Sequence, residues 1–276
     1  MTHRTIAFIG GGNMARSLVG GLLKNGWSRD DLLVSDPDPA ARQAFGQALG
    51  IKTTDSNIDA VKPADIVVLA IKPQVLPKVA KELAGTVGKN KSLVISIAAG
   101  IRTSSLGKWL GEDVPLVRAM PNTAALIGSG ATGLYAKNNV GAELRDIAET
   151  ILRATGIVVW VDNEDLMDVV TALSGSGPAY FFLVMEALEE AAIKQGLRAD
   201  TARLLTLETA FGAAKMALED SAGLADLRQR VTSPGGTTEK AIKSFEDNNI
   251  RAMFENALNA ATRRSRELAE LLGKEQ

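Results

Sequence analysis

A glycine-rich stretch near the start of the chain has the residue types and spacing that suit phosphate binding. It separates a short apolar run, Ile6–Ile9, from a helical pattern. Gly-x-Gly-x-x-Ala after a strand is a dinucleotide-binding pattern, in which a sharp turn brings backbone N–H groups and a helix N-terminus to a pyrophosphate. A tight turn in an unrelated α/β protein is the alternative. The residues expected at the pyrophosphate are Gly10, Gly11, Gly12, Asn13, Met14 and Ala15.

The end of the second expected strand, Leu32–Ser35, bears on which dinucleotide binds. An acidic residue there holds a ribose diol and favours NAD, whereas a small residue beside a cation admits the 2′-phosphate of NADP. The chain has Ser35 followed by Asp36, with Arg42 as the nearest candidate cation. If Ser35 faces the ribose, NADP fits, and if Asp36 does, NAD is favoured. The sequence leaves both open.

Three other strand ends carry small or rigid residues, namely Ala70–Pro73, Ala98–Gly100 and Met120–Thr123. Ligands of doubly wound sheets lie beyond the carboxyl ends of the strands, so these stretches are expected to line one cleft and to admit a flat nicotinamide ring. Ordinary turn chemistry explains any one of them equally well. Their shared position at one edge of the sheet favours a functional interpretation.

Two clusters of small residues lie further along the chain. Ser174–Pro178 reads as a helix entry with proline in the first turn, and a purely structural cap explains it equally well. Ser233–Thr238 reads Ser-Pro-Gly-Gly-Thr-Thr just before another helical pattern. Consecutive backbone N–H groups and two hydroxyls suit a small carboxylate, so an anion site is expected there, with an ordinary loop as the alternative.

Composition removes several classes of chemistry. The chain has 31 basic and 32 acidic residues, no cysteine and one histidine, His3, in the tail before the first strand. Disulfides, thiolate metal sites and cysteine nucleophiles are therefore excluded, and mechanisms based on a histidine are disfavoured. Balanced charge and short apolar runs give no reason to expect a nucleic-acid or membrane partner. We expect a cytoplasmic protein with no metal site.

The elements that must position these residues alternate in the first half of the chain. Short, continuous apolar runs separated by helical stretches are typical of a parallel sheet covered on both faces. The expected strands are Thr5–Gly10, Leu32–Ser35, Ile66–Ile71, Leu93–Ala98, Val114–Arg118, Ala131–Tyr135 and Ile157–Val161, and the expected helices are Met14–Lys24, Pro39–Leu49 and Gly141–Thr155.

After Asp162 the pattern contains helices only. They are expected at Pro178–Gln195, from a cap at Asp200 to Glu219, at Leu224–Val231 and at Ile250–Leu272. The sequence therefore predicts an α/β protein in two domains. Residues 1–162 form a Rossmann-type doubly wound parallel sheet, and residues 163–276 form an all-helical domain.

The motifs together resemble the pyrroline-5-carboxylate reductase family. The resemblance implies that the helical domain is a dimerisation domain and that each active site is completed across a homodimer, with dimers or rings of dimers (decamers) as the assembly. It implies reduction of the cyclic imine 1-pyrroline-5-carboxylate to L-proline by hydride transfer from NAD(P)H, the last step of proline biosynthesis. The family generally prefers NADPH and tolerates NADH. The matching segments, which follow the family order, are Phe8–Ala15, Ala70–Pro73, Ser96–Gly100, Met120–Thr123, Ser174–Tyr180 and Val231–Thr238.

Site residues follow from the same resemblance. Ser35 is expected near the ribose, and Glu164 near the substrate, with a solvated helix residue as the alternative for Glu164. Thr238 is expected close to the imine nitrogen, as the catalytic residue. The adenosine and ribose side would be flanked by Asn57, Ala70, Ile71, Lys72 and Pro73, the nicotinamide by Ala98 and Gly100, and the substrate carboxylate by Ser233, Gly235, Gly236, Thr237 and Thr238.

An imine suits a protein with so little histidine. Its nitrogen is basic enough to be protonated before or during hydride arrival, so a strong acid is dispensable, whereas a ketone needs a positioned acid. Proximity and orientation then supply most of the acceleration. The Thr238 hydroxyl is expected to hydrogen-bond the nitrogen and to relay a proton from water, since threonine alone is too weak an acid.

Two other functions are compatible with a Rossmann domain joined to helices. A β-hydroxyacid dehydrogenase would use a lysine as its acid–base group, for which Lys215 or Lys240 could serve, although neither lies in a recognisable motif. A nucleotide-sensing protein would bind NADP(H) without turnover and would leave the Ser233–Thr238 loop without a role.

Overall fold

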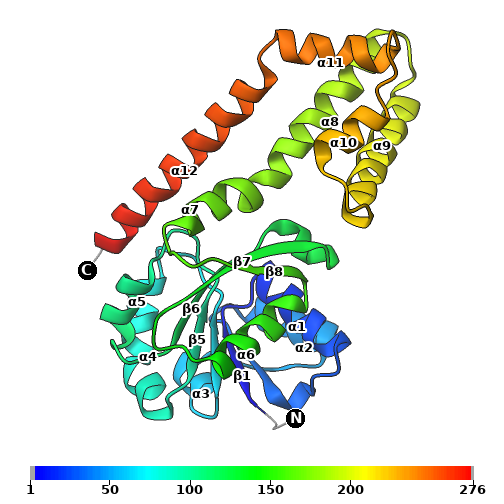
Figure 1. Cartoon of the computed structure of the whole chain (residues 1–276). Coiled ribbons are helices and arrows are strands. Elements are labelled where there is room, and N and C mark those ends of the chain that lie inside the picture. The colour runs from blue at the N-terminus through cyan, green and yellow to red at the C-terminus, as the bar shows by residue number, and fades with distance from the viewer. Residues whose placement is uncertain (1–3, 275–276) are drawn as a thin grey trace. The chain divides into compact units, whose positions relative to one another are not determined.

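The structure is a computed structural model that describes residues 4–274, so His3 lies outside the described residues (Figure 1). The chain divides into two compact units. The first contains the described residues up to Ser176 together with those from Ala260 onward, and the second contains Gly177–Asn259. Each unit is described by itself.

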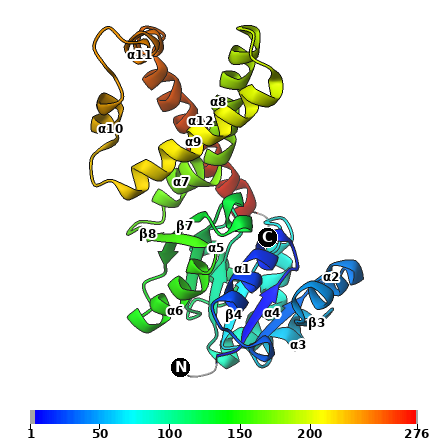
Figure 2. The same ribbon diagram turned by 90° about the vertical axis from the view of Figure 1, so that its right-hand side faces the viewer.

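An eight-stranded sheet forms the centre of the first unit, in the order β3-β2-β1-β4-β5-β6-β7-β8. The order of its first six strands is that of a Rossmann sheet. β3 and β8 form the two edges, which Figure 2 shows at opposite ends of the sheet. The strands are β1 Ile6–Ile9, β2 Leu32–Ser35, β3 Lys52–Thr54, β4 Ile66–Leu69, β5 Leu93–Ser96, β6 Leu116–Met120, β7 Gly130–Ala136 and β8 Gly156–Trp160.

Two strands, β7 and β8, run against the other six, where a fully parallel sheet was expected. β7 pairs antiparallel with β6, and β8 then pairs parallel with β7. The connection from β6 to β7 holds only a short 3₁₀ helix, Thr123–Ile127. A parallel return needs a crossover of a dozen or more residues, so this short connection turns the chain back antiparallel.

Helices cover both faces of the sheet because the central strands β1, β4 and β5 are buried along their whole length. α1, α2 and α6 pack on one face. α3, α4 and α5 pack on the other, where Leu272 of α12 joins the same apolar cluster. These helices are α1 Asn13–Lys24, α2 Pro39–Leu49, α3 Asn57–Val61, α4 Leu76–Asn90, α5 Thr103–Leu110, α6 Ala142–Arg153 and α12 Ile250–Lys274.

The described part of the second unit is entirely helical. α8 follows directly on α7 and a π-helical turn, Thr171–Gly175, that both belong to the first unit. Ser174–Pro178 spans the end of the π-helical turn and the start of α8, so Pro178 lies in the first turn of a helix, as expected. The remaining helices are α7 Leu166–Val170, α8 Gly177–Lys194, α9 Ala199–Glu219, α10 Leu224–Arg230 and α11 Thr237–Asp247.

The expected cap of α9 differs from the structure. Asp200 does not cap α9, because Arg198 is the N-cap residue and Asp200 lies in the first turn, where its carboxylate accepts hydrogen bonds from Thr201 and Arg198. The boundary expected at residues 162 and 163 stays a prediction. The compact units separate at Ser176, and residues 260–274 return to the first unit.

Packing between α1 and α6 gives a first testable prediction. A Cβ at Gly21 would lie 2.2 Å from the carbonyl oxygen of Ala154, whereas a Cβ at Gly20 would meet nothing within 4 Å. We expect Gly21→Ala to lower the free energy of unfolding by about 1–3 kcal/mol through overpacking. Gly20→Ala, the matched control on the same helix, should raise it by roughly 0.5–1 kcal/mol. Urea denaturation at one protein concentration measures both, and equal effects would contradict the packing described.

Candidate active site

The turn after β1 lies at the switch point of the sheet. The chain runs from β1 to β2 and β3 on one side and from β4 to β8 on the other, so β1 and β4 lie side by side. Gly10 has a φ of +101°, and a Cβ there would lie 2.5 Å from the carbonyl oxygen of Ala70. The fold itself therefore requires glycine at this position, and the turn opens where ligands of such sheets bind.

Gly12 is a glycine that the protein fold does not require. It is the N-cap residue of α1 with a φ of −72°, which any residue can adopt, and a Cβ there would meet nothing within 4 Å. No side chain caps this helix. The space beside Gly12 and the first N–H groups of α1 therefore fit a dinucleotide pyrophosphate, because a side chain would fill the space that the phosphates need.

Side chains at the end of β2 form the expected ribose side of the site. Ser35 is buried, and its hydroxyl donates to Asn57 Oδ1 at 2.6 Å. Both oxygens of Asp36 accept backbone hydrogen bonds, from Gly11 at 2.7 Å and from Asp38 at 2.8 Å. Arg42 lies beside them and donates to the carbonyl oxygens of Asp36 and Pro37. The acidic side chain is thus fixed at the glycine turn, with a cation next to it.

The other expected stretches follow the neighbouring strands β4, β5 and β6. Ala70, Ile71, Lys72 and Pro73 follow β4, and Ala98 and Gly100 follow β5. Because these strands are parallel and adjacent, their carboxyl ends meet at the edge that holds the glycine turn. After β6, Asn122 donates to the carbonyl oxygen of Ser174 and accepts from the N–H of Ala131, which ties the π-helical turn to β7.

Glu164 lies in a network of charged side chains beside the loop after β5. Its carboxylate accepts from the backbone N–H and the hydroxyl of Thr103, both at 2.7 Å, and pairs with Arg118 at 3.3 Å. Burial lowers the pKa of Arg118, and the carboxylates of Glu164 and Asp168 oppose this shift. Both oxygens of Glu164 are therefore engaged within the protein. A contact between Glu164 and the substrate stays a prediction.

The Ser233–Thr238 loop leads into α11, as expected, but its donors differ from the expected ones. The N–H of Gly235 donates to the Glu239 carboxylate at 3.0 Å, and the N–H of Gly236 donates to the carbonyl oxygen of Ser233. The first helical hydrogen bond of α11 comes from Lys240. The donors that remain for an anion are thus the N–H groups that begin α11, at Thr237 and Thr238, and the neighbouring hydroxyls.

Arg118 and Asp168 were not predicted to belong to the site. Arg118 is 1% exposed and Asp168 is 0% exposed, and both belong to the network around Glu164. An arginine at the end of an apolar strand was a signal, since arginine is almost never fully buried unless it is paired. Asp168 gave no signal, because its partner Ser265 is 97 residues further along the chain.

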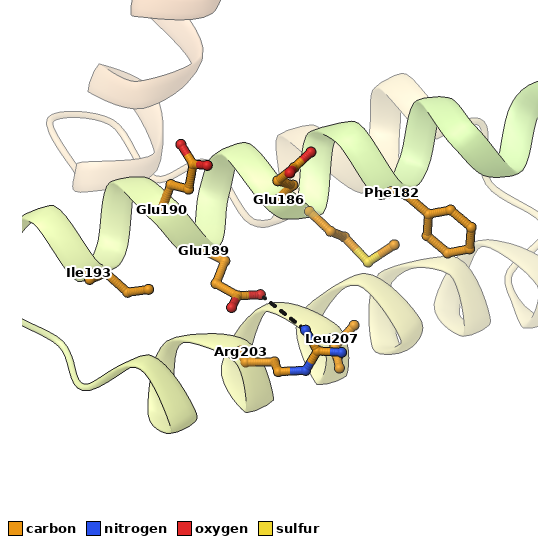
Figure 3. A pocket seen from close by; sticks show the side chains of 8 residues that line it. Phe182, Glu186, Glu189, Glu190, Ile193, Arg203 and Leu207 are labelled. Atoms are coloured by element: carbon orange, nitrogen blue, oxygen red, sulfur yellow. Dashed lines mark ion pairs between the residues drawn. The ribbon is translucent and has the colours of Figure 1, made fainter.

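The second unit exposes large apolar side chains that a folded monomer normally covers. Phe181 is 70% exposed, Leu204 67% and Phe211 63%. A groove of about 570 Å³ lies between α8 and α9, and Figure 3 shows Phe182 at its side and the ion pair between Glu189 and Arg203. Surfaces of this kind mark protein interfaces.

By length and composition, one helical stretch among the described residues, Leu166–Lys194, could cross a membrane. Helices of protein interfaces share this apolar composition, so the finding is weak evidence for a membrane span. Among the same residues, no group of three or more His, Cys, Asp or Glu could hold a metal ion.

The sheet order, the glycine turn and the small residues at the strand ends define the class of this protein as a dinucleotide-dependent oxidoreductase. Comparisons with known proteins agree. Residues 5–100 match the family model for NADP oxidoreductases that are coenzyme F420-dependent, and residues 164–268 match the model for pyrroline-5-carboxylate reductase dimerisation.

Full-length relatives identify the family. The chain is 51% identical to pyrroline-5-carboxylate reductase from Pseudomonas aeruginosa over 99% of this chain and 100% of the relative. It resembles the solved structure of pyrroline-5-carboxylate reductase from Coxiella burnetii, with a TM-score of 0.94, 48% identity and coverage of 97% and 99%. Pyrroline carboxylate reductase from Plasmodium falciparum, solved with NADP bound, gives a TM-score of 0.85, 28% identity and coverage of 98% and 99%. The chain belongs to the pyrroline-5-carboxylate reductase family.

The space beside Gly12 gives a second testable prediction. We expect Gly12→Val to fold normally and to lose at least about tenfold in NADPH affinity, because one lost charge-assisted hydrogen bond to phosphate costs roughly 1.5–3 kcal/mol. Calorimetric titration with NADPH measures the affinity. Gly46→Val on α2 is the control, since a Cβ there also meets nothing within 4 Å. Normal NADPH binding by Gly12→Val would contradict the assignment of this turn.

Proposed function

We propose that this enzyme reduces 1-pyrroline-5-carboxylate to L-proline by hydride transfer from NADPH, the last step of proline biosynthesis. The observation that carries the cofactor half of the proposal is the uncapped α1 N-terminus beside Gly12, where the fold leaves room for a pyrophosphate. Full-length similarity to pyrroline-5-carboxylate reductases supports the reaction. Bound NADPH supplies the hydride that reduces the imine carbon.

The substrate carboxylate binds at the Ser233–Thr238 loop in this proposal. The N-terminus of α11 carries a partial positive charge and N–H groups that precede the first helical hydrogen bond, both of which favour an anion. The hydroxyls of Ser233 and Thr237 add donors beside them. Gly235 and Gly236 act by shaping the turn, since their own N–H groups already have partners in the loop.

Thr238 is the residue proposed to act at the imine nitrogen. It lies in the first turn of α11, so a substrate held by its carboxylate at this terminus has its ring close to the threonine hydroxyl. The hydroxyl hydrogen-bonds the nitrogen and passes on a proton from water, which balances the hydride gained at carbon. Orientation provides most of the rate enhancement, because the protonated imine is already electrophilic.

Glu164 is proposed to lie near the substrate, with its carboxylate held in place by Arg118 and by hydrogen bonds from Thr103. The exposed apolar side chains of α8 and α9 support a homodimer in which each active site is completed across the interface. We also propose that these dimers assemble into a ring and that the enzyme is located in the cytoplasm.

Arg42 is the proposed partner of the NADP 2′-phosphate, which gives a third testable prediction. Its guanidinium is held just after the end of β2 by the backbone carbonyl groups of Asp36 and Pro37. We expect Arg42→Ala to lose about tenfold or more in the ratio of kcat/KM for NADPH to that for NADH, because arginine–phosphate pairs are among the strongest charge-assisted interactions. An unchanged ratio would remove Arg42 from cofactor recognition and would favour Asp36 as the ribose ligand.

Thr238 gives the fourth testable prediction and the test of the proposed function. The wild-type enzyme should oxidise NADPH when 1-pyrroline-5-carboxylate is added, and a β-keto acid should not replace the imine. We expect Thr238→Ala to lower kcat by about 10²-fold, as is usual for a lost proton-transfer group, with unchanged NADPH affinity.

The control is Thr238→Ser, which keeps the hydroxyl and should recover most of the turnover. Full turnover by Thr238→Ala would show that the hydroxyl has no part in the reaction. NADPH binding by the wild type without oxidation by any imine would contradict the proposed function itself.

A further inference from the structure

Asp168 joins parts of the first unit that are far apart in the sequence. It lies in α7 and is 0% exposed. Its Oδ1 accepts a hydrogen bond of 2.7 Å from the hydroxyl of Ser265 in α12, and its Oδ2 accepts one of 3.3 Å from Arg102. Arg102 precedes α5, in the loop that follows β5. One buried carboxylate thus connects the later part of α12 with this loop.

The same part of α12 lies directly against the loop. A Cβ at Gly100 would lie 3.3 Å from Leu272 Cδ1 and 3.7 Å from the backbone nitrogen of Ala269. Leu272 belongs to the apolar cluster that contains Ala98 and other residues around the loop. The loop therefore has almost no free space on its α12 side, and its position depends on where α12 is held.

Such a network is poorly explained by stability alone. Removing charges from water costs several kcal/mol per ion, and buried ion pairs are often no more stabilising than apolar residues of similar size. The network fixes the positions of Ser265 and Arg102 relative to each other, because each of them binds one oxygen of the Asp168 carboxylate. The loop that contains Arg102 also contains Ala98 and Gly100, which are assigned to the nicotinamide end of the cofactor.

We propose that Asp168 is a positioning residue that, through Ser265 and Arg102, holds the loop 97–102 in the position that receives the nicotinamide ring. The inference rests on the proposed function, since it assigns the loop to the nicotinamide. Asp168 acts through the loop and does not touch the cofactor. It therefore affects the nicotinamide half of NADPH and leaves the adenosine half, which the turn after β1 and the end of β2 hold, unaffected.

The variant Asp168→Asn tests this inference, because asparagine keeps the size and an acceptor for Ser265 but places an N–H₂ group against Arg102. Calorimetry with NADPH and with 2′,5′-ADP, which lacks the nicotinamide, separates the two halves of the site. We expect NADPH affinity to fall by about tenfold or more and kcat to fall by up to about 10²-fold, as a displacement of about 1 Å can cause. Affinity for 2′,5′-ADP should not change.

Asp165→Asn is the matched control. Asp165 binds the same arginine at 2.6 Å, which lowers its pKa, but it lies on the surface, where ion pairs contribute little. It should leave the affinity for both ligands close to that of the wild type. Ser265→Ala removes only one hydroxyl and should reproduce the NADPH-specific loss in weaker form, so it decides the question if Asp168→Asn does not fold.

Equal losses of both ligands in Asp168→Asn and Ser265→Ala would overturn the inference, because they indicate general destabilisation of the unit. Unchanged affinities would overturn it as well, since the network would then have no influence on the loop. A wild-type enzyme that binds NADPH but does not reduce the imine would contradict the proposed function, while the comparison of the two ligands would still decide the role of Asp168.

Discussion

The approach of β1 and β4 at Gly10 is the constraint on which the rest of the site depends. The two strands run side by side, and the backbone of Ala70 comes so close to Gly10 that no side chain fits between them. Only this contact allows α1 to begin where the chain changes direction across the sheet, with its first N–H groups at the strand ends. The strands β1 to β5 are parallel neighbours, so their carboxyl ends lie at one edge of the sheet. This edge holds Ser35 at the end of β2, Asn57 after β3, and the loops after β4 and β5.

The second unit follows a different principle. Its helices expose phenylalanine and leucine side chains along α8 and α9, so its folding as an isolated monomer would leave a large apolar surface in water. In a dimerisation domain, a surface of this kind is buried between the two subunits. The Ser233–Thr238 loop lies between α10 and α11 of the same unit, so the proposed site of the substrate carboxylate and the exposed apolar surface belong to one helical unit. The first unit, in contrast, has its own continuous core on both faces of the sheet.

The sequence predicted the elements that rest on local patterns and missed those that rest on distant partners. β2 and α2 have the bounds that apolar periodicity and Pro39 indicated. β3 was missed because Lys52–Thr54 is a short polar edge strand without an apolar run. The reversed direction of β7 depends on the short connection from β6. The π-helical turn at Thr171–Gly175 is held by a hydrogen bond from Asn122. The periodicity of apolar residues indicates neither feature.

For the candidate site, the glycine turn was predictable because its residue types suffice to define it. The engaged N–H groups of Gly235 and Gly236 were not predictable, since their partners follow from the local backbone path. Nor was the buried network, because the pairing of Asp168 with Ser265 requires the end of the chain to return to the sheet. Sequence motifs thus predicted the loops of the candidate site better than the side chains that support these loops.

The return of α12 also affects how the protein is made. Leu272 completes an apolar cluster whose other buried members lie between Ala7 and Leu116. A nascent chain emerges from the ribosome in sequence order. One face of the sheet therefore stays partly uncovered until the helical insertion, Gly177–Asn259, has been synthesised. An isolated fragment that stops at Ser176 would keep that gap open, and the exposed side chains of the gap would favour aggregation of the fragment.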